Sequence, residues 1–274
     1  MNRRGFLRDL TGAARRPAPA HEPEPVPALS AEEVERYSRQ LVLPDWSEAT
    51  QLALRERAVL VIGAGGLGSP VATYLAGAGV GRLGIADDDA VELSNLPRQP
   101  LHFTPDLGVP KAVSAAAKLG FLNPEVVVEP YQVRLDASNA AGLVEGQDLV
   151  VDCSDSFATR YAVNAACCAA GIGLVEAGVV GWAGLVMAIR PGETACYRCA
   201  FPTEPPPGAA PTCAQAGVLG PAAGVVGSLQ ALAALRALAG HPVESGFLQV
   251  DLAEPALTRV AVARRPDCPD CGAG

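Results

Sequence analysis

The glycine-rich stretch at residues 59–70, VLVIGAGGLGSP, limits the possible folds more than any other part of the chain. An apolar run precedes three glycines in G-x-G-x-x-G spacing, Gly63, Gly65 and Gly68, and small apolar residues follow at helical spacing. This pattern predicts a buried strand, a tight turn and a helix. The first glycine permits the turn, the second lets a ligand approach the backbone, and the third lets the helix pack on the strand. Because a helix N-terminus attracts anions, the pattern is typical of a nucleotide-binding site.

Apolar runs and helical patterns alternate along the rest of the chain. We expect further strands at 82–89, 125–133 and 148–155, two more within 173–190, and helices at 31–40, 110–122, 161–171 and 221–238. This alternation predicts a Rossmann-like doubly wound α/β fold, with a mostly parallel sheet and helices on both faces. In such folds the site lies beyond the carboxyl ends of the strands.

The composition is that of a folded, acidic protein. Apolar residues make up 49% of the 274 residues and the net charge is −8, which argues against disorder and against a nucleic-acid partner. We expect one domain over residues 30–274, preceded by a disordered, basic and proline-rich tail over residues 1–29.

Two segments resemble targeting or membrane sequences. The Arg3-Arg4 pair is similar to a twin-arginine export signal, but Asp9 interrupts the apolar segment that such a signal needs, so we expect a cytoplasmic protein. Residues 205–235 carry no charge, yet Pro221, Gln230 and several glycines predict a buried or interface helix and no membrane span.

Charged residues after the glycine motif help to identify the nucleotide. Asp87 lies 19 residues beyond Gly68, where a carboxylate binds ribose hydroxyls in both NAD and ATP sites. Arg98 and Lys111 follow it, and two cations suit a triphosphate that is cleaved between its α and β phosphates. Asp155, at the end of the 148–155 strand, is a candidate Mg²⁺ ligand. Considered one at a time, each of these residues could also have a purely structural role, as a surface cation or as a helix cap.

These segments resemble the MoeB/ThiF/HesA adenylyltransferases, which are related to the ubiquitin-activating enzymes. The resembling text is RYSRQL (36–41), GAGGLGSPVATYLAGAGVGRLGIADDDAVELSNLPRQ (63–99), GVPK (108–111), DCSDSFATRYAVN (152–164), CYRC (196–199), TCAQAGVLGP (212–221) and CPDC (268–271). It extends over residues 35–272, in order and with matching spacing.

The resemblance implies a site for ATP and Mg²⁺. We expect it to comprise Gly63, Gly65, Gly66, Gly68, Asp87, Ser94, Asn95, Arg98, Lys111, Asp155 and Ser156. Arg39 matches an arginine that in such enzymes reaches the triphosphate of the neighbouring subunit, which implies a homodimer. The family often has Asp-Asn where this chain has Asp155-Ser156, so the contact at Ser156 differs.

Four of the eight cysteines form two C-x-x-C pairs. Cys196 with Cys199 and Cys268 with Cys271 fit a tetrahedral zinc site that clamps the C-terminal region to the domain, and the resemblance implies the same metal. The alternative is a pair of redox dithiols, or plain thiols.

The remaining cysteines have other interpretations. Cys213 precedes a predicted helix in a proline-rich loop, and its thiol is a candidate nucleophile, as in relatives that pass sulfur or form a covalent link to their carrier. The alternative is a packed small residue. Cys153, Cys167 and Cys168 lie in apolar segments and are expected in the core.

The expected function is ATP-dependent adenylation of the C-terminal Gly-Gly carboxylate of a ubiquitin-like sulfur-carrier protein, in molybdopterin, thiamin or thiolated-tRNA type pathways. A separate donor protein then supplies sulfur. The glycines at 178, 181 and 184 suit a thin carrier tail, and Leu185 replaces a polar residue of the relatives. The alternatives are an NAD-dependent oxidoreductase and a non-catalytic scaffold that binds the carrier.

Overall fold

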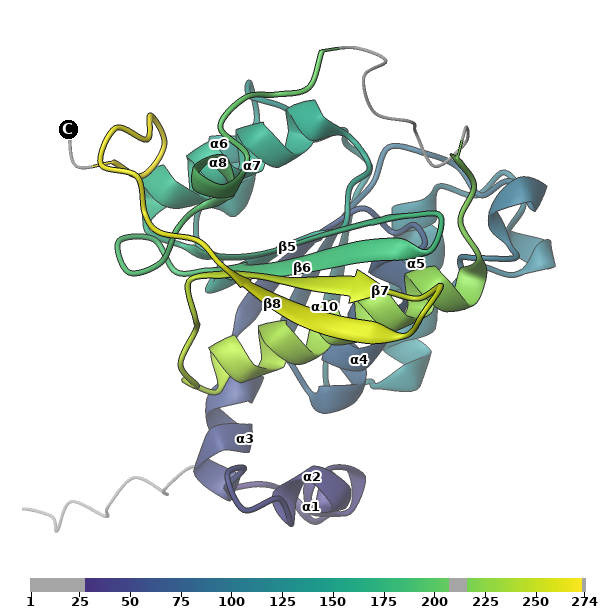
Figure 1. Ribbon diagram of the computed structural model, residues 1–274. Coiled ribbons are helices and arrows are strands. Elements are labelled where there is room, and N and C mark those ends of the chain that lie inside the picture. Colours follow the sequence, from purple (N-terminus) through teal and green to yellow (C-terminus); the bar gives the residue numbers. More distant parts are fainter. Residues whose placement is uncertain (1–27, 207–215, 273–274) are drawn as a thin grey trace, which may run out of the picture.

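A computed structural model describes residues 28–206 and 216–272, which form a single eight-stranded sheet in the order β3-β2-β1-β4-β5-β6-β7-β8 (Figure 1). The strands are β1 (Ala58–Ile62), β2 (Arg82–Ala86), β3 (Val127–Tyr131), β4 (Leu149–Asp152), β5 (Gly173–Val180), β6 (Ala183–Ile189), β7 (Gly246–Asp251) and β8 (Ala256–Ala261). The first five strands in sequence are parallel, and β6 to β8 continue the sheet in antiparallel order. The predicted doubly wound, mostly parallel fold is therefore confirmed.

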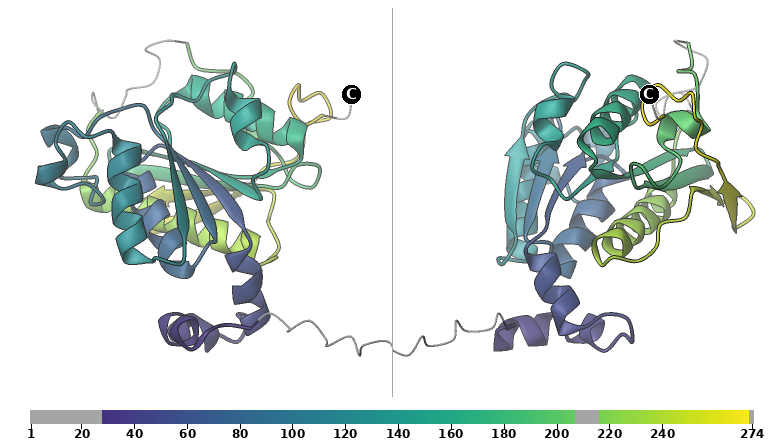
Figure 2. Two further views of the ribbon diagram at one scale, coloured as in Figure 1. Left: turned by 180° about the vertical axis from the view of Figure 1, so that it is seen from behind. Right: turned by 90° about the vertical axis from the view of Figure 1, so that its left-hand side faces the viewer.

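Two helical layers cover the sheet and bury its central strands. The helices and 3₁₀ turns in the described residues are α1 (Ala31–Arg36), α2 (Ser38–Leu41), α3 (Glu48–Arg55), α4 (Gly68–Ala78), η1 (Leu93–Asn95), η2 (Thr104–Asp106), α5 (Lys111–Leu122), α6 (Ala140–Val144), α7 (Phe157–Ala170), α8 (Tyr197–Ala200) and α10 (Gly220–Leu238). Helices α4, α5 and α10 pack on one face, and α6, α7 and α8 lie over the other (Figures 1 and 2). Strand β1 is apolar at every position because both of its faces are covered.

Helix α10 carries most of the segment that is uncharged in the sequence. It is long and apolar enough to cross a membrane by length and composition, but in the structure it packs against α4, β5 and β6. Val226 and Gln230 are completely buried there, and the Gln230 amide donates to the carbonyls of Asp152 and Val175. Helix α10 is thus a core element, as the sequence predicted.

The N-terminal helices lie at the opposite end of the sheet from the glycine turn. Arg55 ends α3 just before β1 begins, so α1 to α3 lie near the amino ends of the parallel strands (Figure 1). Gln40 and Gln51 donate to the carbonyl of Ala78 and fix these helices to the C-terminus of α4. The single helix expected at 31–40 is two helices, broken at Tyr37. The expected tail at residues 1–29 lies almost entirely outside the described residues.

The turn between β1 and α4 leaves no space for a side chain at Gly68. A Cβ atom there would lie 1.8 Å from the Gly63 carbonyl oxygen, a backbone atom that cannot move aside. We expect Gly68→Ala to lower the free energy of unfolding by about 3 kcal/mol or more, measured by chemical denaturation. Gly77→Ala on the same helix is the control: its Cβ meets nothing within 4 Å, so it should stabilise by about 0.5–1 kcal/mol. Equal stabilities for the two variants would contradict the tight turn.

Candidate functional site

The glycine turn brings a set of free backbone amides to the carboxyl end of β1. Gly63 has a φ of 89°, and its N–H donates to the Ala86 carbonyl at 2.7 Å, which ties the turn to the end of β2. Within the described part of the chain, the amides of Gly65, Gly66 and Leu67 have no acceptor. Free amides at a helix N-terminus favour an anion such as a phosphate.

Asp87 closes the turn from the neighbouring strand. Its Oδ2 accepts the Ala64 N–H at 2.7 Å, and its Oδ1 accepts the Asp89 N–H at 2.9 Å. Burial raises the pKa of the Asp87 carboxyl, while these two N–H groups and the Lys111 ammonium oppose the rise. The carboxylate is therefore fixed in position, and its remaining lone pairs line the cavity, where ribose hydroxyls can donate to them.

Both predicted cations lie beside the turn. A Cβ on Gly66 would lie 3.9 Å from the Arg98 Cγ, and the Arg98 Nη1 donates to the Ser94 carbonyl at 2.7 Å, which orients the guanidinium. The Lys111 side chain is only 7% exposed, and its Nζ lies 2.7 Å from the exposed Asp89 carboxylate. Two cations and a row of free amides thus share one wall, which suits a ligand with several negative charges.

Asp155 and Ser156 approach from β4. Asp155 is exposed at the cavity wall, and within the described residues its carboxylate takes part in no hydrogen bond or ion pair. Ser156 also lines the cavity and caps α7 by accepting the Thr159 N–H at 3.4 Å. An uncommitted carboxylate in the same cavity as the glycine turn has the chemistry of a Mg²⁺ ligand.

All these groups line one cavity of about 1050 Å³ at the carboxyl ends of the parallel strands. Its predicted residues are Gly63, Gly65, Gly66, Asp87, Asn95, Arg98, Lys111, Asp155 and Ser156. The cavity extends along the β5–β6 hairpin at Gly178 and Gly184 to a wall that includes Tyr197, Phe201 and Phe247. These aromatic residues could not be predicted as part of the site from the sequence. They lie in or next to α8 and β7, which are far from the glycine turn in the chain and come close to it only in the folded structure.

Several predicted residues do not line the cavity. Gly68 lies beneath the turn, and Ser94 contributes its carbonyl to Arg98 from outside. Arg39 is exposed on α2, at the far end of α4, a helix about 16 Å long, so it does not reach the cavity of its own chain. Cys213 lies outside the described residues.

Sequence reasoning missed several polar side chains of the cavity, among them Gln99 and Arg160. Gln99 is buried, and its Oε1 has no hydrogen-bond partner among the described residues. Arg160, on α7, lines the cavity and forms an ion pair with the buried Glu176. Arg160 lies in the segment 152–164 that resembles the family, five residues after Asp155. This position was the sequence feature that could have identified Arg160 as a site residue.

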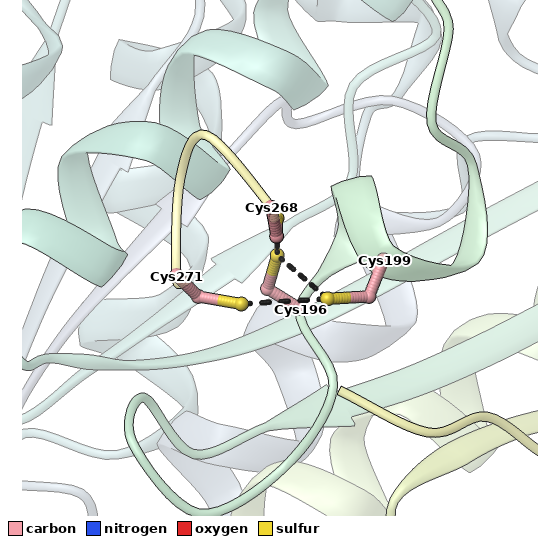
Figure 3. Close-up of side chains that lie close together, drawn as sticks. All are labelled: Cys196, Cys199, Cys268 and Cys271. Atoms are coloured by element: carbon pink, nitrogen blue, oxygen red, sulfur yellow. Dashed lines mark hydrogen bonds between the residues drawn. The ribbon is translucent and has the colours of Figure 1, made fainter. Parts of the chain in front are cut away.

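The four paired cysteines converge in one cluster (Figure 3), and none of them lines the cavity. The Sγ atoms of Cys196 and Cys268 are 3.5 Å apart, those of Cys199 and Cys271 are 3.4 Å apart, and those of Cys196 and Cys199 are 3.8 Å apart. Four thiolates at about 2.3 Å from one zinc ion would be about 3.8 Å from each other, so the cluster fits zinc.

Neighbouring groups hold the C-terminal pair against the domain. The Asp270 carboxylate accepts from Asn164 Nδ2 at 2.7 Å and from Arg198 Nε at 2.8 Å. The Arg265 amide donates to the Cys199 sulfur at 3.4 Å, as in many thiolate metal sites. As expected, Cys153 and Cys167 are buried in the core, whereas Cys168 is only half-buried.

Solved structures share this architecture. E. coli MccB bound to MccA-N7isoASN superposes with a TM-score of 0.78 at 24% identity, over 87% of this chain and 75% of MccB. At this level of identity, the likeness establishes the fold.

Curated proteins and a family model establish the family. A sulfur carrier protein adenylyltransferase of Thermus thermophilus is 47% identical over 248 residues, which are 88% of this chain and 92% of that protein. The SAMP-activating enzyme E1 of Haloferax volcanii is 44% identical, over 90% of this chain and 92% of its own length. The adenylyltransferase and sulfurtransferase MOCS3 of Sus scrofa is 48% identical over 90% of this chain, which spans about half (55%) of MOCS3. Because the ThiF family model also matches residues 37–270, the chain belongs to the ThiF family.

Proposed function

We propose that this chain is an adenylyltransferase that uses ATP to activate the C-terminal Gly-Gly carboxylate of a small ubiquitin-like sulfur-carrier protein. The observation that carries the proposal is the gathering of Asp87, Arg98, Lys111 and Asp155 around the glycine turn in one cavity. Two cations and a free carboxylate suit a triphosphate with its metal better than they suit a nicotinamide dinucleotide. The name of the Thermus relative points to the same class of substrate.

The reaction needs positioning and charge neutralisation, with no proton transfer. The carrier carboxylate, ionised at neutral pH, attacks the α-phosphorus of ATP. A new oxygen–phosphorus bond forms as the bond to the bridging oxygen of the β-phosphate breaks, so pyrophosphate leaves and the carrier becomes an acyl-adenylate. Arg98 and Lys111 neutralise the charge that grows on the phosphates, while Asp87 and Asn95 orient the nucleoside.

Asp155 is the residue that would hold Mg²⁺. Its carboxylate is exposed at the cavity wall, without a partner among the described residues, and Mg²⁺ prefers carboxylate and phosphate oxygens together. When bound, the ion neutralises phosphate charge.

The cavity also supports a narrow path for the carrier tail. Gly178 lies on β5 and Gly184 on the neighbouring strand β6. Both glycines line the cavity, and because they have no side chains they leave space there. Beyond them the wall includes Leu185 and Phe201, so the tail next to the Gly-Gly end meets an apolar surface. A Gly-Gly terminus, which has no side chains, fits between these strands.

The proposed zinc site is structural. A zinc ion held by Cys196, Cys199, Cys268 and Cys271 has this role because the four thiols leave no open coordination position.

The proposed active form is a homodimer in the cytoplasm, in which Arg39 of the partner subunit contributes a third cation. A separate donor protein supplies sulfur to the activated carrier.

ATP–pyrophosphate exchange tests the proposal. The purified chain with Mg²⁺, unlabelled ATP, labelled pyrophosphate and a Gly-Gly-ended ubiquitin-like protein from the same organism should form labelled ATP. The same carrier without its final glycine is the control and should support no exchange, because its carboxylate no longer reaches the α-phosphate. No exchange with any small Gly-Gly-ended protein of the organism would overturn the proposal.

A further inference from the structure

Three ionisable side chains that the proposed reaction does not use are buried beside the cavity. Asp152 ends β4 and Glu176 lies opposite it on β5, and both residues are 0% exposed. Arg160 on α7 covers them, with 10% of its side chain exposed at the cavity wall. Buried charges cost several kcal/mol each unless they are compensated, and apolar residues often replace such groups without loss of stability. A role in the site would account for their presence.

The contacts of this cluster converge on the backbone of one residue, Ser154. Arg160 Nη1 lies 3.1 Å from Glu176 Oε1, while Arg160 Nη2 donates to the Ser154 carbonyl at 2.8 Å. The Ser154 N–H donates to Asp152 Oδ1 at 2.8 Å. The cluster therefore holds Ser154 by both its N–H and its C=O. The next residue is Asp155.

The surrounding glycines leave room for this arrangement. A Cβ on Gly178 would lie 2.7 Å from Arg160 Nη1, so the guanidinium occupies the space of a missing side chain. A Cβ on Gly63 would lie 3.1 Å from the Cys153 carbonyl oxygen and 3.4 Å from the Ser154 nitrogen. The loop that carries Asp155 is thus packed directly against the phosphate-binding turn.

Glu176 stabilises the guanidinium and has little other bonding. Neither of its carboxyl oxygens has a hydrogen-bond partner of good geometry among the described residues, and Asp152 Oδ2 has none either. Burial and the nearby Asp152 raise the pKa of the Glu176 carboxyl well above its ordinary value, while Arg160 opposes the rise. Glutamine has the same shape, and its amide oxygen can take the position of Oε1 beside Arg160 Nη1, so Glu176→Gln should change little.

We propose that Glu176 is a positioning residue that acts through Arg160: it fixes the Ser154 peptide and thereby aims the Asp155 carboxylate into the cavity. This inference rests on the proposed function, in which Asp155 holds Mg²⁺. Arg160 and Glu176 come from different elements, so the loop keeps its shape only while α7 and β5 are joined through this pair.

Hydrogen exchange of the loop tests the inference without any nucleotide or metal. Glu176→Leu removes the ion pair with Arg160 but keeps the volume. It should speed exchange of the Ser154 amide about tenfold, because the guanidinium that donates to the Ser154 carbonyl is then no longer held in place. Glu176→Gln should behave as the wild type. Glu129→Leu is the matched control: Glu129 also lies on a strand of the sheet and pairs with an arginine, Arg82, at 3.3 Å, but it does not line the cavity. Unchanged exchange in Glu176→Leu would overturn the inference.

The Mg²⁺ dependence of pyrophosphate exchange gives a second readout. Glu176→Leu should need about ten times more Mg²⁺ for half-maximal rate, whereas Glu176→Gln and Glu129→Leu should match the wild type. If Glu176→Leu does not fold, Arg160→Lys replaces it, because an ammonium cannot span Glu176 and Ser154 as the guanidinium does. A wild-type chain without exchange contradicts the proposed function; an active wild type with an unaltered Glu176→Leu variant contradicts only the positioning role.

Discussion

Arg98→Ala is expected to lower kcat/KM for carrier-dependent ATP–pyrophosphate exchange by about 10²–10³-fold. The guanidinium lies beside Gly66 at the phosphate-binding turn and is oriented by the Ser94 carbonyl, so it opposes charge on the phosphates from a fixed position. A preorganised cation in a cavity needs little rearrangement as charge grows in the transition state. The measurement is the initial exchange rate over a range of ATP concentrations.

Arg57→Ala controls for the loss of a positive charge. Arg57 precedes β1 at the amino end of the sheet and forms an exposed ion pair with Asp148, so its removal should change kcat/KM less than about threefold. If Arg98→Ala also stays within that range, the cation has no part in the chemistry. The chain would then act as a scaffold that binds the carrier.

Removal of the metal from the cysteine cluster is expected to lower the melting temperature by about 10 °C or more. The two cysteine pairs are separated by 68 residues, and one zinc ion held by all four would join the C-terminal segment to α8. Loss of this link should cost about 4 kcal/mol, and in a domain of this size each kcal/mol corresponds to about 2–4 °C. The measurement is thermal unfolding with and without a strong zinc chelator, together with metal analysis of the purified chain, which should show one zinc per chain.

Two variants distinguish the effect of losing a cysteine of the cluster from the effect of losing another cysteine. Cys268→Ser should lose the metal and melt at the temperature of the chelated protein. Cys168→Ala removes a half-buried thiol that lies beside Cys196 but is not one of the four, and it should keep the metal. A metal-free wild-type chain whose melting does not respond to the chelator would favour the redox-dithiol interpretation.

The parts of the site that follow strand ends could be predicted from the sequence. Gly63 and Asp87 come directly after an apolar strand and Asp155 follows the end of β4 by three residues, and parallel strands bring their carboxyl ends to one edge of the sheet. Lys111 begins a helix whose start was marked by Pro110. Topology alone therefore placed these side chains together, without knowledge of any side-chain contact.

The buried cluster could not be predicted in this way. Glu176 is one acidic residue in an apolar strand, and nothing local indicates whether it faces a cation, the core or solvent. Its ion pair with Arg160 depends on how α7 packs over β5. The β7–β8 hairpin was missed because its exposed residues alternate weakly in polarity, and α3 was missed because its few buried residues, such as Gln51, are not all apolar.

Helix α8 links the cysteine cluster to the cavity through only four residues. Cys196 precedes this helix and Cys199 lies in it, while Tyr197, Ala200 and Phe201 belong to the cavity wall. A zinc ion held by these cysteines would therefore fix the position of residues in the cavity wall without lining the cavity itself. If the proposed function holds, we expect zinc depletion to weaken binding of the carrier protein more than binding of ATP.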